Sequence, residues 1–200
     1  MQRLSSALIL LWLTGCAGLS APQTVNQTLH VLDTQPAVQP AAVQRNIVLL
    51  VNSLPARPGY DTSQMVYTIR PHELGYFATN RWVAPPARML EPLLVSALGQ
   101  TRAFRAVAPA TETLAGDLRL DVEVLQLHQN FSTRPSQMVL GALAQLVDLR
   151  TQRILATRQF DETEAATSDD AKGGAAAANR ALPRLLGKVA EFCVSESGSR

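Results

Sequence analysis

Hydrophobic and polar residues alternate most regularly in the segment 118–124. Its apolar positions, which are separated by charged residues, are Leu118, Leu120, Val122 and Val124. A period of two predicts a β-strand that buries one face. At Leu125 the alternation slips by one residue. We predict a β-bulge between Val124 and Leu125, because an extra residue exchanges the two faces of a strand.

Six further segments have the composition or the pattern of strands. Residues 47–51 are a continuous apolar run, which is typical of a central strand buried on both faces. The other five segments are 29–32, 65–69, 76–77, 138–149 and 154–162. Residues 148–153 resemble the turn of a hairpin that joins the last two strands.

One segment in the middle of the chain has the period of a helix. Its apolar residues, at spacings of three and four, are Leu90, Leu93, Leu94, Ala97 and Leu98. Pro85 and Pro86 precede this run and Pro92 lies within it. We expect the helix to begin near Arg88, which places Pro92 in or near the first turn. The alternative is a longer helix that Pro92 kinks.

A second helix is predicted near the C-terminus. It begins after Ser168-Asp169-Asp170, because these side chains are good N-caps. Its apolar face consists of Ala178, Leu182, Leu185, Leu186, Val189 and Cys193. We expect Pro183 to kink this helix.

The order of these elements predicts an α+β fold. Neighbouring strands that resemble hairpins favour a mainly antiparallel sheet of about six or seven strands, with two helices packed on one face. The sequence has no evident repeat or second domain. We therefore expect a single domain over residues 28–195 and a polar tail at 196–200.

The N-terminus has the pattern of a bacterial lipoprotein signal. Arg3 precedes an apolar run over residues 7–13, and Leu13-Thr14-Gly15-Cys16 reads as a lipobox. The apolar run is far shorter than the roughly 20 residues that span a bilayer. The lipobox resemblance implies that residues 1–15 are removed and that Cys16 carries covalent acyl chains such as palmitate. The alternatives are an ordinary secretory signal cut nearby, or an unprocessed apolar start.

Residues 16–27 are small and polar and are expected to form a lipidated tether. Extended chain covers at most about 3.3–3.6 Å per residue, so the domain would stay within a few nanometres of its membrane. Ala17 follows the predicted lipidation site. In bacteria that retain lipoproteins in the inner membrane through Asp at this position, Ala17 favours the periplasmic face of the outer membrane.

The net charge and the cysteine content further limit the functions that this chain could have. The formal net charge is +2, and removal of Arg3 with the signal leaves about +1. No basic run is present, so the sequence argues against nucleic-acid binding. With Cys16 lipidated, Cys193 has no cysteine partner within the chain. We expect Cys193 to be a buried, inert thiol rather than a reactive one or an intermolecular disulfide.

The sequence contains no common catalytic or nucleotide-binding motif, whether GxSxG, HExxH, CxxC or GxxxxGK[ST]. The histidines are expected at surface or sheet-edge positions: His30, His72 and His128. The carboxylates Asp161, Glu162 and Glu164 cluster at one strand end, which favours a solvated face over a catalytic pair. We therefore expect a protein that is not an enzyme, with no metal site and no cofactor besides the lipid on Cys16.

Aromatic residues are concentrated in one stretch of the chain, at Tyr60, Tyr67, Tyr76, Phe77 and Trp82. Arginines are interspersed among them. Tyrosine, tryptophan and arginine are enriched where proteins bind partners, because they bury area while keeping a polar group. The candidate partner-binding residues are Tyr76, Arg81 and Trp82. The alternative is that Tyr67 and Trp82 pack beneath the first helix.

Taken in order, these segments resemble the ABC-type transport auxiliary lipoproteins, the family that includes the PqiC lipoproteins. The most specific part is the succession of Met65-Val66-Tyr67-Thr68-Ile69-Arg70, Leu74-Gly75-Tyr76 and Arg81-Trp82-Val83-Ala84-Pro85-Pro86. Leu146-Val147-Asp148-Leu149, Ile154-Leu155-Ala156 and Phe160 are similar to a later strand–turn–strand of that family. The resemblance covers nearly the whole chain after the signal.

This resemblance implies a non-enzymatic accessory of an ABC system that carries MCE-type lipid-binding subunits. Such systems move phospholipids or other hydrophobic molecules between the inner and outer membranes. The expected partners are the periplasmic MCE-domain subunit, the ABC permease/ATPase complex and the membrane that holds the lipid anchor; a homo-oligomer is also compatible. The alternative is a structural lipoprotein that assists envelope assembly without any ABC system. The cargo, the direction of transport and a lipid pocket in the domain itself stay open.

Overall fold

The computed structural model describes residues 26–34, 38–53, 55–111 and 114–198. The predicted signal, Cys16 and the tether before Asn26 lie outside these residues. The strands are β1 (Thr28–His30), β2 (Arg45–Ser53), β3 (Gln64–Thr68), β4 (Gly75–Trp82), β5 (Phe104–Pro109), β6 (Leu118–Asn130), β7 (Gln137–Asp148) and β8 (Arg153–Ala165). The helices are α1 (Pro86–Gln100) and α2 (Ala171–Glu196). Neither helix is apolar enough along its length to cross a bilayer.

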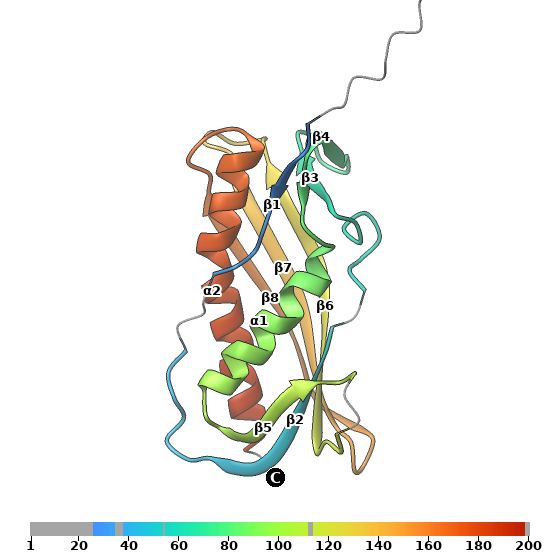
Figure 1. The fold of residues 1–200 in the computed structure, drawn as a ribbon, viewed down its shortest axis with the longest axis vertical. Coiled ribbons are helices and arrows are strands. Elements are labelled where there is room, and N and C mark those ends of the chain that lie inside the picture. The colour runs from blue at the N-terminus through green and yellow to red at the C-terminus, as the bar shows by residue number, and fades with distance from the viewer. Residues whose placement is uncertain (1–25, 35–37, 54, 112–113, 199–200) are drawn as a thin grey trace, which may run out of the picture.

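The eight strands form one forked sheet (Figure 1). On one side, β6 pairs along its whole length with β7, and β7 pairs with β8; both pairings are antiparallel. On its other side, β6 pairs in parallel with β2 over residues 118–122 and with β3 over residues 128–130. Strand β5 extends the β2 branch, and β4 and then β1 extend the β3 branch.

The sheet is therefore mixed and has eight strands, so the prediction of a mainly antiparallel sheet with six or seven strands is wrong. The connections explain the difference. The parallel pairs join strands that are not consecutive in the chain, namely β1 with β4, β2 with β5, and β6 with both β2 and β3, so other elements form the crossovers between them. The missed strand, β5, is short and ends at Pro109.

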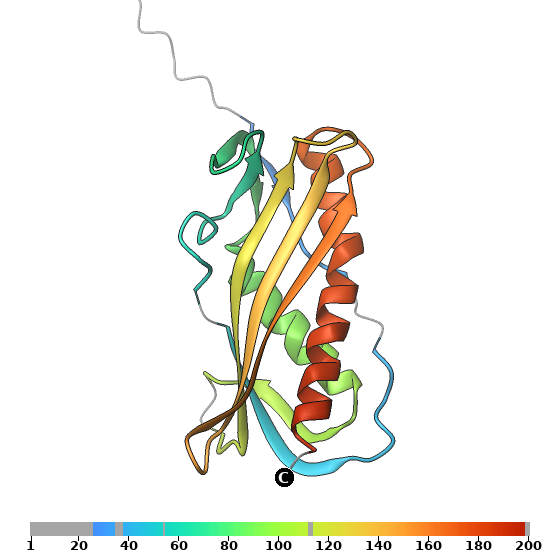
Figure 2. The ribbon, with the colours of Figure 1, turned by 180° about the vertical axis from the view of Figure 1, so that it is seen from behind.

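Both helices lie on one face of the sheet, as predicted (Figures 1 and 2). α1 packs on β2 and β5, and α2 packs on β7 and β8. α1 begins at Pro86, two residues before the predicted start, because a proline at the first helical position loses no helical hydrogen bond. Pro92 consequently lies inside the helix. α2 begins as predicted, with the Asp170 side chain accepting a hydrogen bond from the Gly173 backbone amide at 2.7 Å.

The main core lies between the sheet and the helices, and its buried residues are mostly leucine, valine and alanine. The predicted bulge is confirmed, because the register of β6 and β7 shifts between Val124 and Gln126. β2 is confirmed as a central strand, since it pairs on both sides and Leu49 and Val51 are fully buried. Cys193 is also fully buried, and burial raises the pKa of its thiol, which is consistent with an inert residue.

The C-terminal residues belong partly to the folded unit. Glu196, which was expected to begin a polar tail, is the last residue of α2. Ser197 is buried, and the Arg45 guanidinium donates a hydrogen bond to its hydroxyl at 2.6 Å. The end of α2 is thereby attached to the start of β2.

Candidate functional site

Neither helix packs mainly on the β3–β4 branch, although Met65 and Trp82 of this branch lie in the main core. In Figure 1, α2 lies over β7 and β8, while α1 lies lower, over β2 and β5. The turn between β3 and β4 and the turn after β6 lie together at the opposite end of the molecule from β5. The residues that line this end determine what the domain can bind there.

Three aromatic rings gather at this end. Tyr67 comes from β3, Phe77 from β4, and Phe131 follows β6 directly. The ring centroids of Tyr67 lie 5.0 Å from Phe77 and 6.0 Å from Phe131. The Phe131 backbone amide donates to the Thr68 carbonyl at 2.8 Å, which brings Phe131 beside β3. Gly75 pairs with Tyr67 across the hairpin, and a Cβ there would collide with the Tyr67 ring.

These rings form the wall of a pocket of about 610 Å³. We call it the apolar pocket; its residues are Tyr67, Ile69, Tyr76, Phe77, Ala78, Phe131, Thr133, Arg134 and Asp169. Ile69 and Tyr76 are 57% and 40% exposed, so part of this apolar lining is accessible from solvent. Thr133, Arg134 and Asp169 supply its polar rim.

Asp169 is held in place at this rim. Its carboxylate accepts a hydrogen bond from the Ser136 backbone amide at 2.7 Å. This backbone bond, and a second bond with the Ser136 side chain, hold the pKa of Asp169 below its ordinary value. The rim therefore carries a carboxylate and, in Arg134, a guanidinium.

The opposite face of the same branch has a polar pocket of about 570 Å³. Successive residues of a strand point to opposite faces, so Thr68 and Arg70 line this pocket while Tyr67 and Ile69 line the apolar one. Within the polar pocket the Tyr60 hydroxyl lies 3.4 Å from His128 Nδ1. Burial lowers the pKa of His128 and raises that of Tyr60, so both groups are neutral at pH 7.

The structure separates the three candidate partner-binding residues. Tyr76 lines the apolar pocket, and its hydroxyl donates to the Gly59 carbonyl at 3.3 Å. Arg81 is half-buried farther along β4. Trp82 is 2% exposed and packs edge-on against His30 within the core, so its ring is not available to a partner in this fold. Packing in the core, the alternative considered for Trp82, is what the structure shows.

Sequence reasoning missed Phe131, Arg134 and Asp169. All three lie in connections after β6 or before α2, far in sequence from the aromatic stretch. Phe131 could have been noticed, because it is one of few aromatic residues and directly follows the most regular strand. Asp169 was noticed only as part of the N-cap signal before α2, and nothing local distinguishes Arg134.

One histidine is placed differently from the expectation. His128 is buried, because β6 is a central strand with neighbours on both sides. His30 Nε2 lies 2.9 Å from the Asn80 side-chain oxygen on the neighbouring strand, and His72 is exposed in the β3–β4 turn. Among the residues that the structure describes, no three His, Cys, Asp or Glu side chains are grouped so that they could hold a metal ion.

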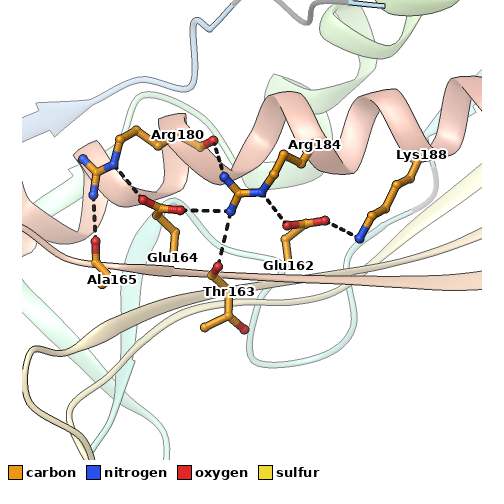
Figure 3. A network of polar contacts seen from close by, with 7 residues as sticks. All are labelled: Glu162, Thr163, Glu164, Ala165, Arg180, Arg184 and Lys188. Atoms are coloured by element: carbon orange, nitrogen blue, oxygen red, sulfur yellow. Dashed lines mark hydrogen bonds and ion pairs between the residues drawn. The ribbon is translucent and has the colours of Figure 1, made fainter.

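Glu162 and Glu164 belong to a charge network that joins β8 to α2 (Figure 3). Arg184 contacts both carboxylates, at 2.8 Å to Glu162 and 3.0 Å to Glu164. Arg180 binds Glu164 at 2.9 Å, and Lys188 binds Glu162. The expectation of a solvated face is wrong for Glu162, whose side chain is 8% exposed. The three cations lie one helical turn apart and are directed at both carboxylates, so this network is structural.

The pKa shifts in the network have different causes. Burial alone would raise the pKa of Glu162, but hydrogen bonds from Lys188 and Arg184 outweigh it and lower the pKa. The pKa of Glu164 is lowered mainly by its hydrogen bond from Arg180. Both carboxylates thus stay ionised in the folded protein at pH values where the unfolded chain binds protons.

We expect the double variant E162Q/E164Q to lose part of this pH dependence. The ordinary pKa is 4.5, so the network's contribution is fully present above pH 4.5 and is lost as the pH falls through the lower folded-state values. At pH 7 the variant should be less stable by about 1–3 kcal/mol. The measurement is the free energy of urea unfolding between pH 7 and pH 3, with E91Q on α1 as the control. A double variant that loses stability on acidification as steeply as the wild type would contradict this role.

Comparison with known proteins finds a matching family model and solved structures with a similar fold. A family model described as "ABC-type transport auxiliary lipoprotein component" matches residues 29–190. The crystal structure of protein XCC0632 from Xanthomonas campestris is similar with a TM-score of 0.78 and 23% identity, covering 86% of this chain and 97% of that one. The hypothetical protein CT253 from Chlamydia trachomatis is similar with a TM-score of 0.53 and 10% identity, covering 78% and 100%.

At these identities the two solved structures show a shared fold alone. A comparison with curated proteins finds no match. The family model, in contrast, spans the sheet and nearly all of both helices, from β1 into the last turns of α2. This chain therefore belongs to the family of ABC-type transport auxiliary lipoprotein components.

Proposed function

We propose that this protein is a non-enzymatic, outer-membrane-anchored periplasmic accessory of an ABC system with MCE-type subunits. The system would move phospholipids or other hydrophobic molecules between the two membranes. Family membership supports a role in ABC-type transport, and the predicted lipid on Cys16 would supply the membrane anchor. ATP would be hydrolysed by a separate cytoplasmic subunit.

The observation that carries this proposal is the position of the apolar pocket. β1, the first element after the tether, pairs with β4, which contributes three residues to the pocket. An exposed apolar surface beside the attachment point of a lipid anchor suits a protein that works at a membrane. Tyr76 and Ile69 are the most accessible large apolar side chains of this surface.

A pull-down of the tagged full-length protein from detergent-solubilised envelopes tests the proposal. Mass spectrometry should recover an MCE-domain subunit together with the permease and ATPase, and density fractionation should place the protein in the outer membrane. An unrelated outer-membrane lipoprotein with the same tag is the control. If envelope-assembly proteins are recovered and no ABC or MCE subunit is, the protein is a structural lipoprotein instead.

A further inference from the structure

The apolar pocket joins an aromatic wall to a rim with both signs of charge. From this combination we infer that the pocket binds one phospholipid molecule drawn from the membrane to which the protein is anchored. An acyl chain would lie against Tyr67, Phe77 and Phe131, and the headgroup would lie between Arg134 and Asp169. The inference rests on the proposed function and deepens it, because it gives the accessory subunit its own lipid site.

The volume and lining of the pocket suit an acyl chain. Its volume of about 610 Å³ lies within the range of sites that bind small molecules. The three rings contact one another edge-on or tilted, and they are only partly covered by other groups. Ile69 extends the apolar surface outward and is more than half exposed. Burying this surface against methylene groups is favourable, because apolar area is removed from water.

The charges of the rim favour a zwitterionic headgroup. A guanidinium binds phosphate through paired N–H donors, and Arg134 places one at the rim. Asp169 presents a carboxylate, fixed by the Ser136 amide, that would attract a headgroup ammonium. A free fatty acid has no cationic group that could pair with Asp169. The complementary ligand is therefore a phospholipid with phosphate and amine, such as phosphatidylethanolamine.

The path of the chain brings this pocket close to the anchor. β1 runs parallel to β4 with Thr28 opposite Asn80, and Ala78, which lines the pocket, lies two residues before Asn80 on β4. Nine residues lie between Cys16 and Asn26, and the ten steps along the chain from one to the other reach at most about 35 Å. Figures 1 and 2 show that the described chain begins at the end where β3 and β4 turn. A lipidated Cys16 would hold the pocket within reach of the bilayer.

The test compares native and denatured masses of the full-length protein, purified from membranes and incubated with phosphatidylethanolamine vesicles. The covalent anchor remains in both masses, whereas a bound phospholipid adds one lipid mass to the native protein only. We expect one such adduct in the wild type and at least about a tenfold loss in I69E, because the variant places a charge on the acyl-chain surface. The matched control is I154E, since Ile154 is exposed to the same extent (59%) on β8, away from the pocket.

Two further variants test the acyl-chain site and the headgroup site separately. A78W should also remove the adduct, because it fills the pocket with a large side chain. R134Q should weaken it severalfold through loss of the phosphate contact; an unchanged adduct would overturn the assignment of the headgroup. A melting temperature equal to that of the wild type would show that each variant is folded.

No adduct in the wild type, or equal adducts in I69E and I154E, would overturn the inference. If the protein's own acyl chains fill the pocket, the wild type shows no adduct and pocket amides lose hydrogen-exchange protection in C16S, which also overturns it. Recovery of ABC and MCE subunits without an adduct would leave the proposed function standing. An adduct without those subunits would leave the lipid site and remove the proposed function.

Discussion

Replacement of Cys16 by serine is expected to release the protein from the membrane into the soluble periplasmic fraction and to abolish its function in cells. A serine hydroxyl cannot form the thioether that carries the diacylglyceryl group. Each buried methylene contributes about 0.8 kcal/mol to membrane binding, so several acyl chains together make attachment effectively permanent. Immunoblots of fractionated cells and the intact mass of the protein measure the effect.

The second cysteine provides the control for this experiment. Cys193 is fully buried in α2, so C193S keeps the anchor and should remain wholly in the membrane fraction. A C16S protein that still fractionated with membranes and retained full activity would show that attachment does not depend on the lipid. Both the location and the proposed mode of action would then have to be abandoned.

Local sequence patterns predicted the elements that depend on local chemistry. The alternation in β6 gave both the strand and its bulge, and the apolar run in β2 gave a strand buried on both sides. The N-cap at Asp170 gave the start of α2. Each of these signals lies within a few residues of the structure that it specifies.

The branching of the sheet has no such local signal. β6 pairs with β2 and β3 on the same side because β6 is long enough to carry both, one on each half. Periodicity shows which face of a strand is buried, but it does not show which strand lies beside it. The hairpin-like spacing of the later strands therefore suggested a more antiparallel sheet than the one that forms.

The residues of the candidate site could likewise be predicted from the sequence only in part. Tyr76 could be identified, because it stands in a local concentration of aromatic residues. Phe131 and Asp169 join the same pocket only through the β3–β6 pairing and the β8–α2 connection. Trp82 shows the opposite outcome. Its residue type made it a candidate for a partner-binding surface, but its side chain is buried in the core.

The variant W82A is accordingly expected to lose about 3–5 kcal/mol of stability, because it removes a large buried side chain from the core and leaves a cavity. This is a large part of the 5–15 kcal/mol that typically holds a domain together. The melting temperature should fall by roughly 10 °C for a chain of this size. Urea unfolding at pH 7 measures the free energy directly.

Two variants show whether the loss comes from the core position of Trp82. Y76A removes an exposed ring with one long hydrogen bond and should cost about 1 kcal/mol or less. W82F keeps an aromatic ring in the core and should fall between W82A and the wild type. Well below its melting temperature, W82A should still recover the same ABC partners as the wild type. If W82A kept the stability of the wild type but no longer recovered those partners, Trp82 would instead lie at the interface, as its residue type first suggested.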